Sequence, residues 1–130
     1  MRLLPRSWDG NVDEPSRSSL TSIRDDRGIL VAAEFDQIPF AVKRVFTIRG
    51  PESGATRGHH PAPCDQLVVS TGDGQVLVRL GGTPTPIVLG SAGDAVLVPK
   101  GTWIEYDLAD DQSSVLVLAA ERYAESRLTP

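Results

Sequence analysis

Apolar positions along the chain fall in short runs that are rich in β-branched side chains, and several of these runs alternate with polar positions. Runs of this length and a period of two are typical of β-strands rather than helices. The expected strands cover residues 29–35, 42–48, 66–70, 75–80, 87–89, 95–98, 103–107 and 115–120. The pattern therefore predicts about eight short strands.

Turn residues separate these runs and decide how the strands are connected. The breaks include Gly50-Pro51, Gly72-Asp73-Gly74, Gly81-Gly82 and Pro99-Lys100-Gly101. None of these breaks leaves room for a crossover helix, so the strands must be mostly antiparallel. The sequence predicts an all-β sandwich or jelly roll, with a short helical turn near the C-terminus at residues 121–128.

The first part of the chain differs from the rest. Residues 1–22 contain Pro5, Gly10 and Pro15 and a patch of Ser and Arg with little apolar periodicity. This composition is typical of a tail or an arm. We expect one domain over residues 23–130, because 130 residues suffice for a single core.

Charge and composition exclude several function classes. A formal net charge of -4 and a pI of about 5.1 argue against nucleic-acid binding, which needs an excess of cations on one face. The sequence has no apolar run long enough for a membrane span and no signal-peptide pattern. A single cysteine, Cys64, excludes an internal disulfide, so we expect a cytoplasmic protein without membrane partners.

Four cations are close together in the sequence. Lys43, Arg44, Arg49 and Arg57 fall within fifteen residues. They are sufficient for a small anionic ligand, and ordinary solvated surface charge is the alternative.

Two motif frames resemble those of the cupin superfamily. Gly93 to Gly101 has the spacing G-x5-P-x-G, and Gly54 precedes His60 by six residues. In metal-dependent cupins these frames carry three histidines and a glutamate. Only His60 is present here, since Ala62, Gln66 and Ile104 occupy the other positions. One imidazole and one amide do not suit a transition metal, so we expect no metal and no cofactor.

Longer motifs carry a closer resemblance. They read Asp26-Arg27-Gly28, Ile38-Pro39-Phe40, Lys43-Arg44-Val45-Phe46, Arg57-Gly58-x-His60, Gln66-Leu67 and Val98-Pro99, followed by Trp103 and a Val-Leu-Val-Leu-Ala-Ala ending. Together they resemble the WxcM-like cupins, which include the dTDP-4-keto-6-deoxyglucose 3,4-ketoisomerases of deoxysugar biosynthesis.

This resemblance implies a homodimeric jelly roll, often with exchanged N-terminal strands, that binds a dTDP-linked sugar without metal. The implied reaction moves a keto group from C4 to C3 through an enediol, which requires proton transfer between carbons. The family motif continues to a second histidine, where this chain has Ala62. Its aromatic pair after Arg-Val is Phe46-Thr47 here.

Six residues are candidates for the site. His60 is the expected acid/base, and Arg44 and Arg57 are expected to contact the diphosphate. Gln66 offers hydrogen bonds inside the barrel, Trp103 a stacking surface, and Glu105 a carboxyl that replaces the missing acid/base. Their structural alternatives are packed or surface side chains. Glu105 and Tyr106 alternate in direction, so one of the two faces the cavity.

Three functions remain open from the sequence. The first is a sugar-nucleotide cupin that resembles a dTDP-4-keto-6-deoxyhexose 3,4-ketoisomerase. The second is a non-catalytic binding or assembly protein, which Ala62 favours. The third is a divergent metal-free enzyme that acts on another carbonyl compound in natural-product biosynthesis.

Overall fold

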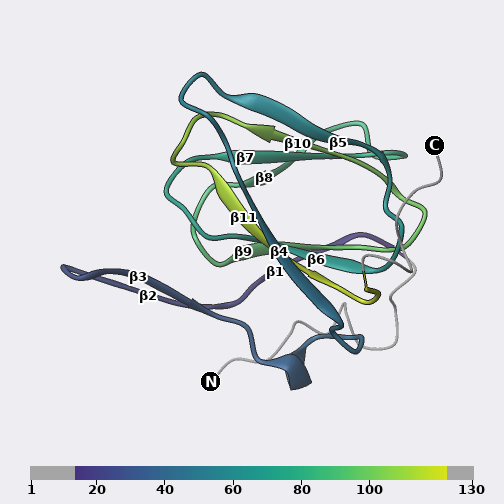
Figure 1. Ribbon diagram of the computed structural model, residues 1–130, viewed down its shortest axis with the longest axis horizontal. Helices are drawn as coiled ribbons and strands as arrows, with labels where there is room; N and C mark the ends of the chain where they lie inside the picture. Colours follow the sequence, from purple (N-terminus) through teal and green to yellow (C-terminus); the bar gives the residue numbers. More distant parts are fainter. Residues whose placement is uncertain (1–13, 123–130) are drawn as a thin grey trace.

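Eleven short strands and one 3-10 turn make up the fold of the computed structural model, which describes residues 14–122 (Figure 1). The elements are β1 (Ser16–Ser19), β2 (Thr21–Asp25), β3 (Gly28–Ala32), η2 (Phe35–Gln37), β4 (Arg44–Arg49), β5 (Ala55–Pro61), β6 (Gln66–Ser70), β7 (Val76–Leu80), β8 (Ile87–Leu89), β9 (Asp94–Val98), β10 (Trp103–Leu108) and β11 (Ser114–Ala119). In the described part of the chain, no helix is long and apolar enough to cross a membrane.

Two antiparallel sheets stack face to face. The five-stranded sheet has the order β1-β9-β6-β11-β4, and the four-stranded sheet has the order β5-β10-β7-β8. The four-stranded sheet lies above the five-stranded one in Figure 1. All strand pairs are antiparallel, which confirms the prediction of an all-β antiparallel jelly roll.

The main core fills the space between the sheets. It is built from alternate residues of the strands, because successive side chains of a strand point to opposite faces. Its members are Ala62, Val68, Val76, Val78, Leu80, Leu89, Val96, Val98, Ile104, Tyr106, Leu108, Val115 and Val117, with Phe46, Ile48 and Ile87 packed against them.

A second apolar layer covers the outer face of the five-stranded sheet. There, Ile38, Phe40 and Val42 of the segment before β4 pack over Leu67 and its neighbours on that face. As a result, β6 is buried on both faces along its whole length. This explains why its sequence is nearly continuously apolar rather than alternating.

The hairpin of β2 and β3 projects from the sandwich (Figure 1). Its strands pair only with each other among the described residues, and Ile23 and Leu30 are each 54% exposed. A two-stranded hairpin by itself is marginally stable in water.

Three strands were missing from the predicted set, and two boundaries differ. The strands β1, β2 and β5 are rich in Ser, Thr, Arg and His, so they carry no clear apolar period. Because β1 pairs with β9, the sandwich begins ahead of the boundary that we expected at residue 23. The predicted strand 29–35 ends at Ala32. The expected helical turn at 121–128 lies almost wholly outside the described residues.

Candidate functional site

The central feature of the site is a bulge in β5. Glu105 of β10 pairs with Gly58, whereas Ile104 pairs with His60, so His59 is an extra residue on β5. Gly58 has φ 91° and His59 has φ 68°. A Cβ atom on Gly58 would lie 2.9 Å from the backbone oxygen of Ile104, so this position requires glycine.

The bulge places Arg57 and His60 on the same face of the sheet. They are three residues apart, and in a regular strand they would point to opposite faces. In the observed register Arg57 lies opposite Tyr106 and His60 opposite Ile104. Since Tyr106 and Ile104 belong to the core between the sheets, Arg57 and His60 start from the inner face of β5, where Arg57 is exposed and His60 is half-buried at the sheet edge.

The ring of His60 is oriented by the backbone. Its Nδ1 atom lies 2.8 Å from the carbonyl oxygen of Pro61. A carbonyl oxygen only accepts hydrogen bonds, so Nδ1 carries the hydrogen in this contact. In the neutral ring Nε2 is then unprotonated and free to accept a proton.

The five-stranded sheet contributes a second pair of polar residues. Gln66 of β6 and Arg44 of β4 both pair with Ala119 of β11, so they lie in one row on the inner face, about 10 Å apart across two strand spacings. The Arg44 guanidinium carbon lies 5.2 Å from the centre of the Phe46 ring, a cation–π contact.

Gln66 has an unused acceptor. Its side chain is buried, and Oε1 has no hydrogen-bond partner among the described residues. Buried polar atoms are usually satisfied, so this atom is available to a ligand or an ordered water.

Gln66 and His60 lie at the same end of the sandwich. Gln66 pairs with Val98, the last residue of β9. A short turn then leads to Trp103 and Ile104, and Ile104 pairs with His60. The strands β4 and β5 are the edge strands of their sheets, so this end is bordered by Arg44 and His60. The structure therefore brings Gln66, Arg44 and His60 to one end of the sandwich, and Arg57 follows on the same face of β5, exposed to solvent.

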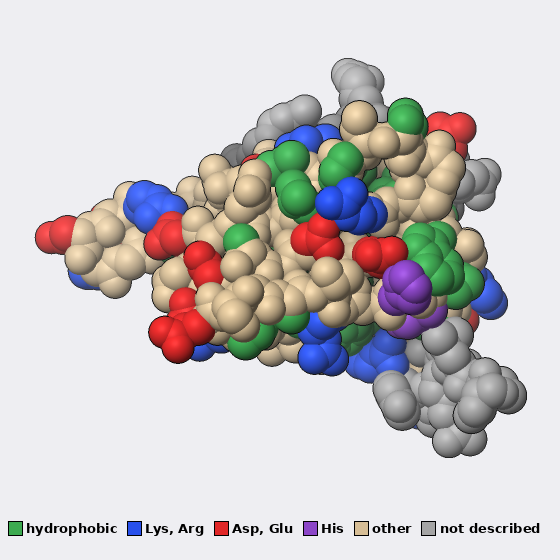
Figure 2. All heavy atoms as spheres, turned by 90° about the horizontal axis from the view of Figure 1, so that it is seen from above, with side chains coloured by type: hydrophobic (Ala, Val, Ile, Leu, Met, Phe, Trp, Pro, Cys, Tyr) green, Lys and Arg blue, Asp and Glu red, His purple; other side chains and the backbone are tan. Residues whose placement is uncertain are grey.

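Trp103 and Glu105 lie elsewhere. They alternate with the inward-facing Ile104 and Tyr106 and therefore point to the outer face of the four-stranded sheet. There His59 Nδ1 lies 3.0 Å from Glu105 Oε1, and the His59 and Trp103 rings meet edge to face at 4.9 Å. Figure 2 shows this face, on which histidine lies beside acidic and hydrophobic side chains. Glu105 and Trp103 are thus separated from His60 by the sheet.

The positions of the cupin ligands are mostly apolar. Ala62 and Ile104 are 2% and 1% exposed and belong to the inner core. Within the described residues, no group of three or more His, Cys, Asp or Glu side chains could hold a metal ion.

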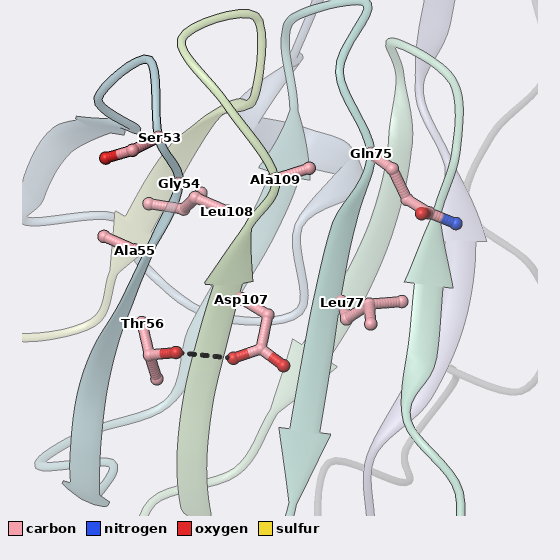
Figure 3. Close-up of a pocket in the computed structure, with 9 residues that line it drawn as sticks. All are labelled: Ser53, Gly54, Ala55, Thr56, Gln75, Leu77, Asp107, Leu108 and Ala109. Atoms are coloured by element: carbon pink, nitrogen blue, oxygen red, sulfur yellow. Dashed lines mark hydrogen bonds between the residues drawn. The ribbon is translucent and has the colours of Figure 1, made fainter.

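A surface hollow of about 300 Å³ lies at the other end of β5 and β10. It is lined by Ser53, Gly54, Ala55, Thr56, Gln75, Leu77, Asp107, Leu108 and Ala109. Figure 3 shows the hydrogen bond from Thr56 to Asp107 in its wall, 2.9 Å long. None of the six predicted site residues lines it.

Comparison with known proteins decides the family. The family model described as "FdtA: WxcM-like, C-terminal" matches residues 14–128. The chain belongs to the WxcM-like family. The resemblance seen in the motifs is thereby confirmed.

Named relatives of this WxcM-like protein are sugar-nucleotide isomerases. It is 32% identical over 107 residues to the TDP-4-oxo-6-deoxy-alpha-D-glucose-3,4-oxoisomerase of Aneurinibacillus thermoaerophilus, covering 80% of this chain and 77% of the relative. It also resembles solved structures. The sugar 3,4-ketoisomerase QdtA from Thermoanaerobacterium thermosaccharolyticum, in complex with TDP, has a TM-score of 0.72 and 27% identity over 84% of this chain and 82% of that one. A 3,4-ketoisomerase from Helicobacter canadensis has a TM-score of 0.70 and 26% identity over 85% of each chain.

Sequence reasoning missed two features of the WxcM-like site. The first is the bulge, whose only signal was Gly58 in a stretch without apolar alternation. The second is the choice between Glu105 and Tyr106. The alternation in β10 showed that one of these two neighbours faces inward, but it did not show which one. The inward residue is Tyr106, which is 5% exposed, and burial raises the pKa of its hydroxyl well above the usual value.

Proposed function

We propose that this protein binds a dTDP-linked 4-keto-6-deoxyhexose and moves its keto group from C4 to C3. The observation that carries the proposal is the inward-facing His60, whose Nδ1 is held by the Pro61 carbonyl so that Nε2 is left as a base. The named relatives act on sugars of this kind, which supports the same class of reaction here.

His60 takes the proton from C3 in this proposal. Removing that proton while the C4 carbonyl accepts the electron pair forms an enediolate, and returning a proton to C4 completes the isomerisation. The two carbons exchange oxidation states within one molecule, so the reaction needs no external oxidant or reductant. We propose that it also needs no metal, because Ala62, Gln66 and Ile104 stand at the cupin ligand positions.

Arg57 and Arg44 are proposed to bind the diphosphate. A guanidinium group forms two parallel hydrogen bonds to phosphate oxygens, which fixes both position and orientation. Arg57 extends from the edge strand β5 and Arg44 from the edge strand β4, so the two approach the opening from different sheets. Gln66 Oε1 is proposed to accept a hydrogen bond from a sugar hydroxyl.

Two measurements on one sample test the proposal. Titration calorimetry with dTDP reports binding. NMR of dTDP-4-keto-6-deoxyglucose in D₂O then reports the 3-keto product and deuterium uptake at the carbon atoms. Binding with product or exchange is the expected result, and a protein that binds neither dTDP nor the sugar nucleotide would contradict it.

A second candidate function is sugar-nucleotide binding without turnover. The specific observation in its favour is that Ala62 and Ile104 are packed into the core, where they provide no acid or base. Binding of dTDP without product and without exchange supports this alternative. Turnover of another carbonyl compound without affinity for dTDP would instead indicate a divergent metal-free enzyme.

We also propose a homodimer in the cytoplasm. The projecting hairpin of β2 and β3 exposes Ile23 and Leu30, and a second copy of the chain would give its edges pairing partners. Analytical ultracentrifugation of the protein and of an Ile23→Glu/Leu30→Glu variant checks this. A monomeric wild-type protein would refute the dimer. A reducing compartment suits the free, buried thiol of Cys64.

A further inference from the structure

Tyr106 combines burial with an unused hydroxyl. Its side chain is 5% exposed and belongs to the core between the sheets, where the other members carry no polar side-chain group. No hydrogen bond joins its hydroxyl to any residue in the described range 14–122. The hydroxyl oxygen is not among the fully buried side-chain atoms that lack a partner, so it is the part of this side chain that a bound molecule can reach.

The register places Tyr106 beside both proposed ligand contacts. It lies directly opposite Arg57, and it is a diagonal neighbour of His60, which pairs with Ile104 two residues away. Diagonal neighbours on one face are about 7–8 Å apart, a distance that aromatic and long side chains bridge. A carbon–oxygen unit of a sugar fits between two such groups when each is at hydrogen-bond distance, about 3 Å.

We propose that Tyr106 is a catalytic residue that donates a hydrogen bond to the substrate carbonyl oxygen at C4 and relays a proton between the two sugar oxygens. This inference rests on the proposed function. Ala62 and Ile104 have no group that can act as an acid. In this proposal Tyr106 of β10 takes this role instead.

The proton transfers balance as follows. His60 Nε2 takes the C3 hydrogen, the C3–C4 double bond forms, and the carbonyl electron pair moves to O4. The Tyr106 hydroxyl gives its hydrogen to O4 and accepts the one on O3, so the phenol ends neutral. The protonated imidazole then returns a proton to C4, and the carbonyl forms at C3.

Burial supports the donor role over a role as base. It raises the pKa of the Tyr106 hydroxyl far above the physiological range, so the phenol keeps its proton. A fixed hydrogen-bond donor of this kind stabilises the negative charge that develops on the oxygen.

The test compares Tyr106→Phe with the wild-type protein. Phenylalanine keeps the ring that packs in the core and removes only the hydroxyl. We expect kcat to fall about 10²- to 10³-fold, as for loss of one oxyanion donor. The affinity for dTDP should be unchanged, since dTDP carries no sugar carbonyl. Exchange of the C3 hydrogen with D₂O should slow together with turnover.

The outcomes separate this inference from the proposed function. If the wild-type protein turns over and Tyr106→Phe is equally fast, the role of Tyr106 is refuted and the proposed function stands. If the wild-type protein does not isomerise the sugar nucleotide, both are refuted.

A second measurement tests the proposal if the Tyr106→Phe variant does not fold. In a Tyr123→Phe background Tyr106 is the only tyrosine, so 3-fluorotyrosine labels it alone. Its fluorine resonance should shift on addition of dTDP-4-keto-6-deoxyglucose, and by more than it does with dTDP, which reaches only the neighbouring Arg57. No shift with the sugar nucleotide, under conditions where it is bound, would overturn the assignment.

Discussion

The two faces of the β5–β10 pair differ in how their polar groups are satisfied. On the outer face each charged group has a partner: His59 contacts Glu105, and Asp107 accepts hydrogen bonds from Arg79 at 2.7 Å and Thr56 at 2.9 Å. On the inner face the Tyr106 hydroxyl has no partner within the described residues. The His60 ring is held at Nδ1 only.

This difference separates groups that serve the structure from groups that are open to a ligand. Paired charges on a solvated sheet face contribute little free energy and need no further partner. An unsatisfied buried polar atom such as Gln66 Oε1 is costly unless a ligand or water satisfies it. The bulge at His59 contributes to this separation, because it places Arg57 and His60 together on the inner face while His59 contacts Glu105 on the outer face.

The largest expected effect compares the two histidines. We expect His60→Asn to lower turnover about 10²- to 10⁴-fold, because a positioned general base is lost. His59→Asn should leave turnover nearly unchanged, since His59 is on the outer face and asparagine tolerates its positive φ. Steady-state kinetics and C3 deuterium exchange check both variants. An equal loss in the two would contradict the separation of the faces.

The next prediction breaks the bulge. Gly58→Ala forces a Cβ atom against the Ile104 backbone at φ 91°, so we expect the free energy of unfolding to fall by about 1–3 kcal/mol. Turnover should fall as well, because the directions of Arg57 and His60 depend on the bulge.

Gly82→Ala is the matched control for the bulge variant. Gly82 has a similar φ of 86°, but a Cβ atom there meets nothing within 4 Å. It should lose some stability and keep its activity. Urea denaturation measures the stability of both variants, and steady-state kinetics measures their activity. Loss of activity in Gly82→Ala alone would argue against the bulge as the feature that positions Arg57 and His60.

The third prediction concerns the inner face in alkali. Burial raises the pKa of Tyr106, so the unfolded chain releases this proton above about pH 10 while the folded chain keeps it. The free energy of unfolding therefore falls as pH rises above that value, by at most about 1.4 kcal/mol per pH unit from this group. Tyr106→Phe should remove this part of the slope in urea denaturation series. Identical slopes in the two proteins would refute the burial effect.

The smallest effect belongs to the outer face in acid. Burial alone would raise the pKa of Asp107, but hydrogen bonds from Arg79 and Thr56 and the charge of Arg79 together lower it. Its stabilising effect is therefore present at neutral pH and is lost as pH falls through the lowered pKa. We expect Asp107→Asn to cost at most about 1 kcal/mol at pH 7. The free energies of unfolding of Asp107→Asn and the wild-type protein should become equal in acid, where Asp107 is protonated. A difference that persists at pH 2 would contradict an origin in the ionised carboxylate.

Much of the fold was predictable because apolar alternation and turn residues are local signals. The strands β4, β6, β7, β8, β9, β10 and β11 coincide closely with predicted runs. The strands β1 and β5 were missed because their side chains are mostly polar and exposed, and their place in the sheets depends on pairing with β9 and β10.

The candidate site was predictable only in part. His60 and Arg57 were recognised through a motif, and the register places both on the inner face of β5. Trp103 and Glu105 were chosen for their chemistry, but the register puts both on the outer face. Tyr106 takes the inward position of β10 instead.

The sequence by itself therefore determined the fold class, the family and the identity of the imidazole that the motif retains. These follow from residue types at fixed spacings. Only the tertiary structure decided which side chains share a face. A period of two holds only along a regular strand, and one extra residue in β5, stabilised by pairing with β10, reverses the direction of every side chain beyond it.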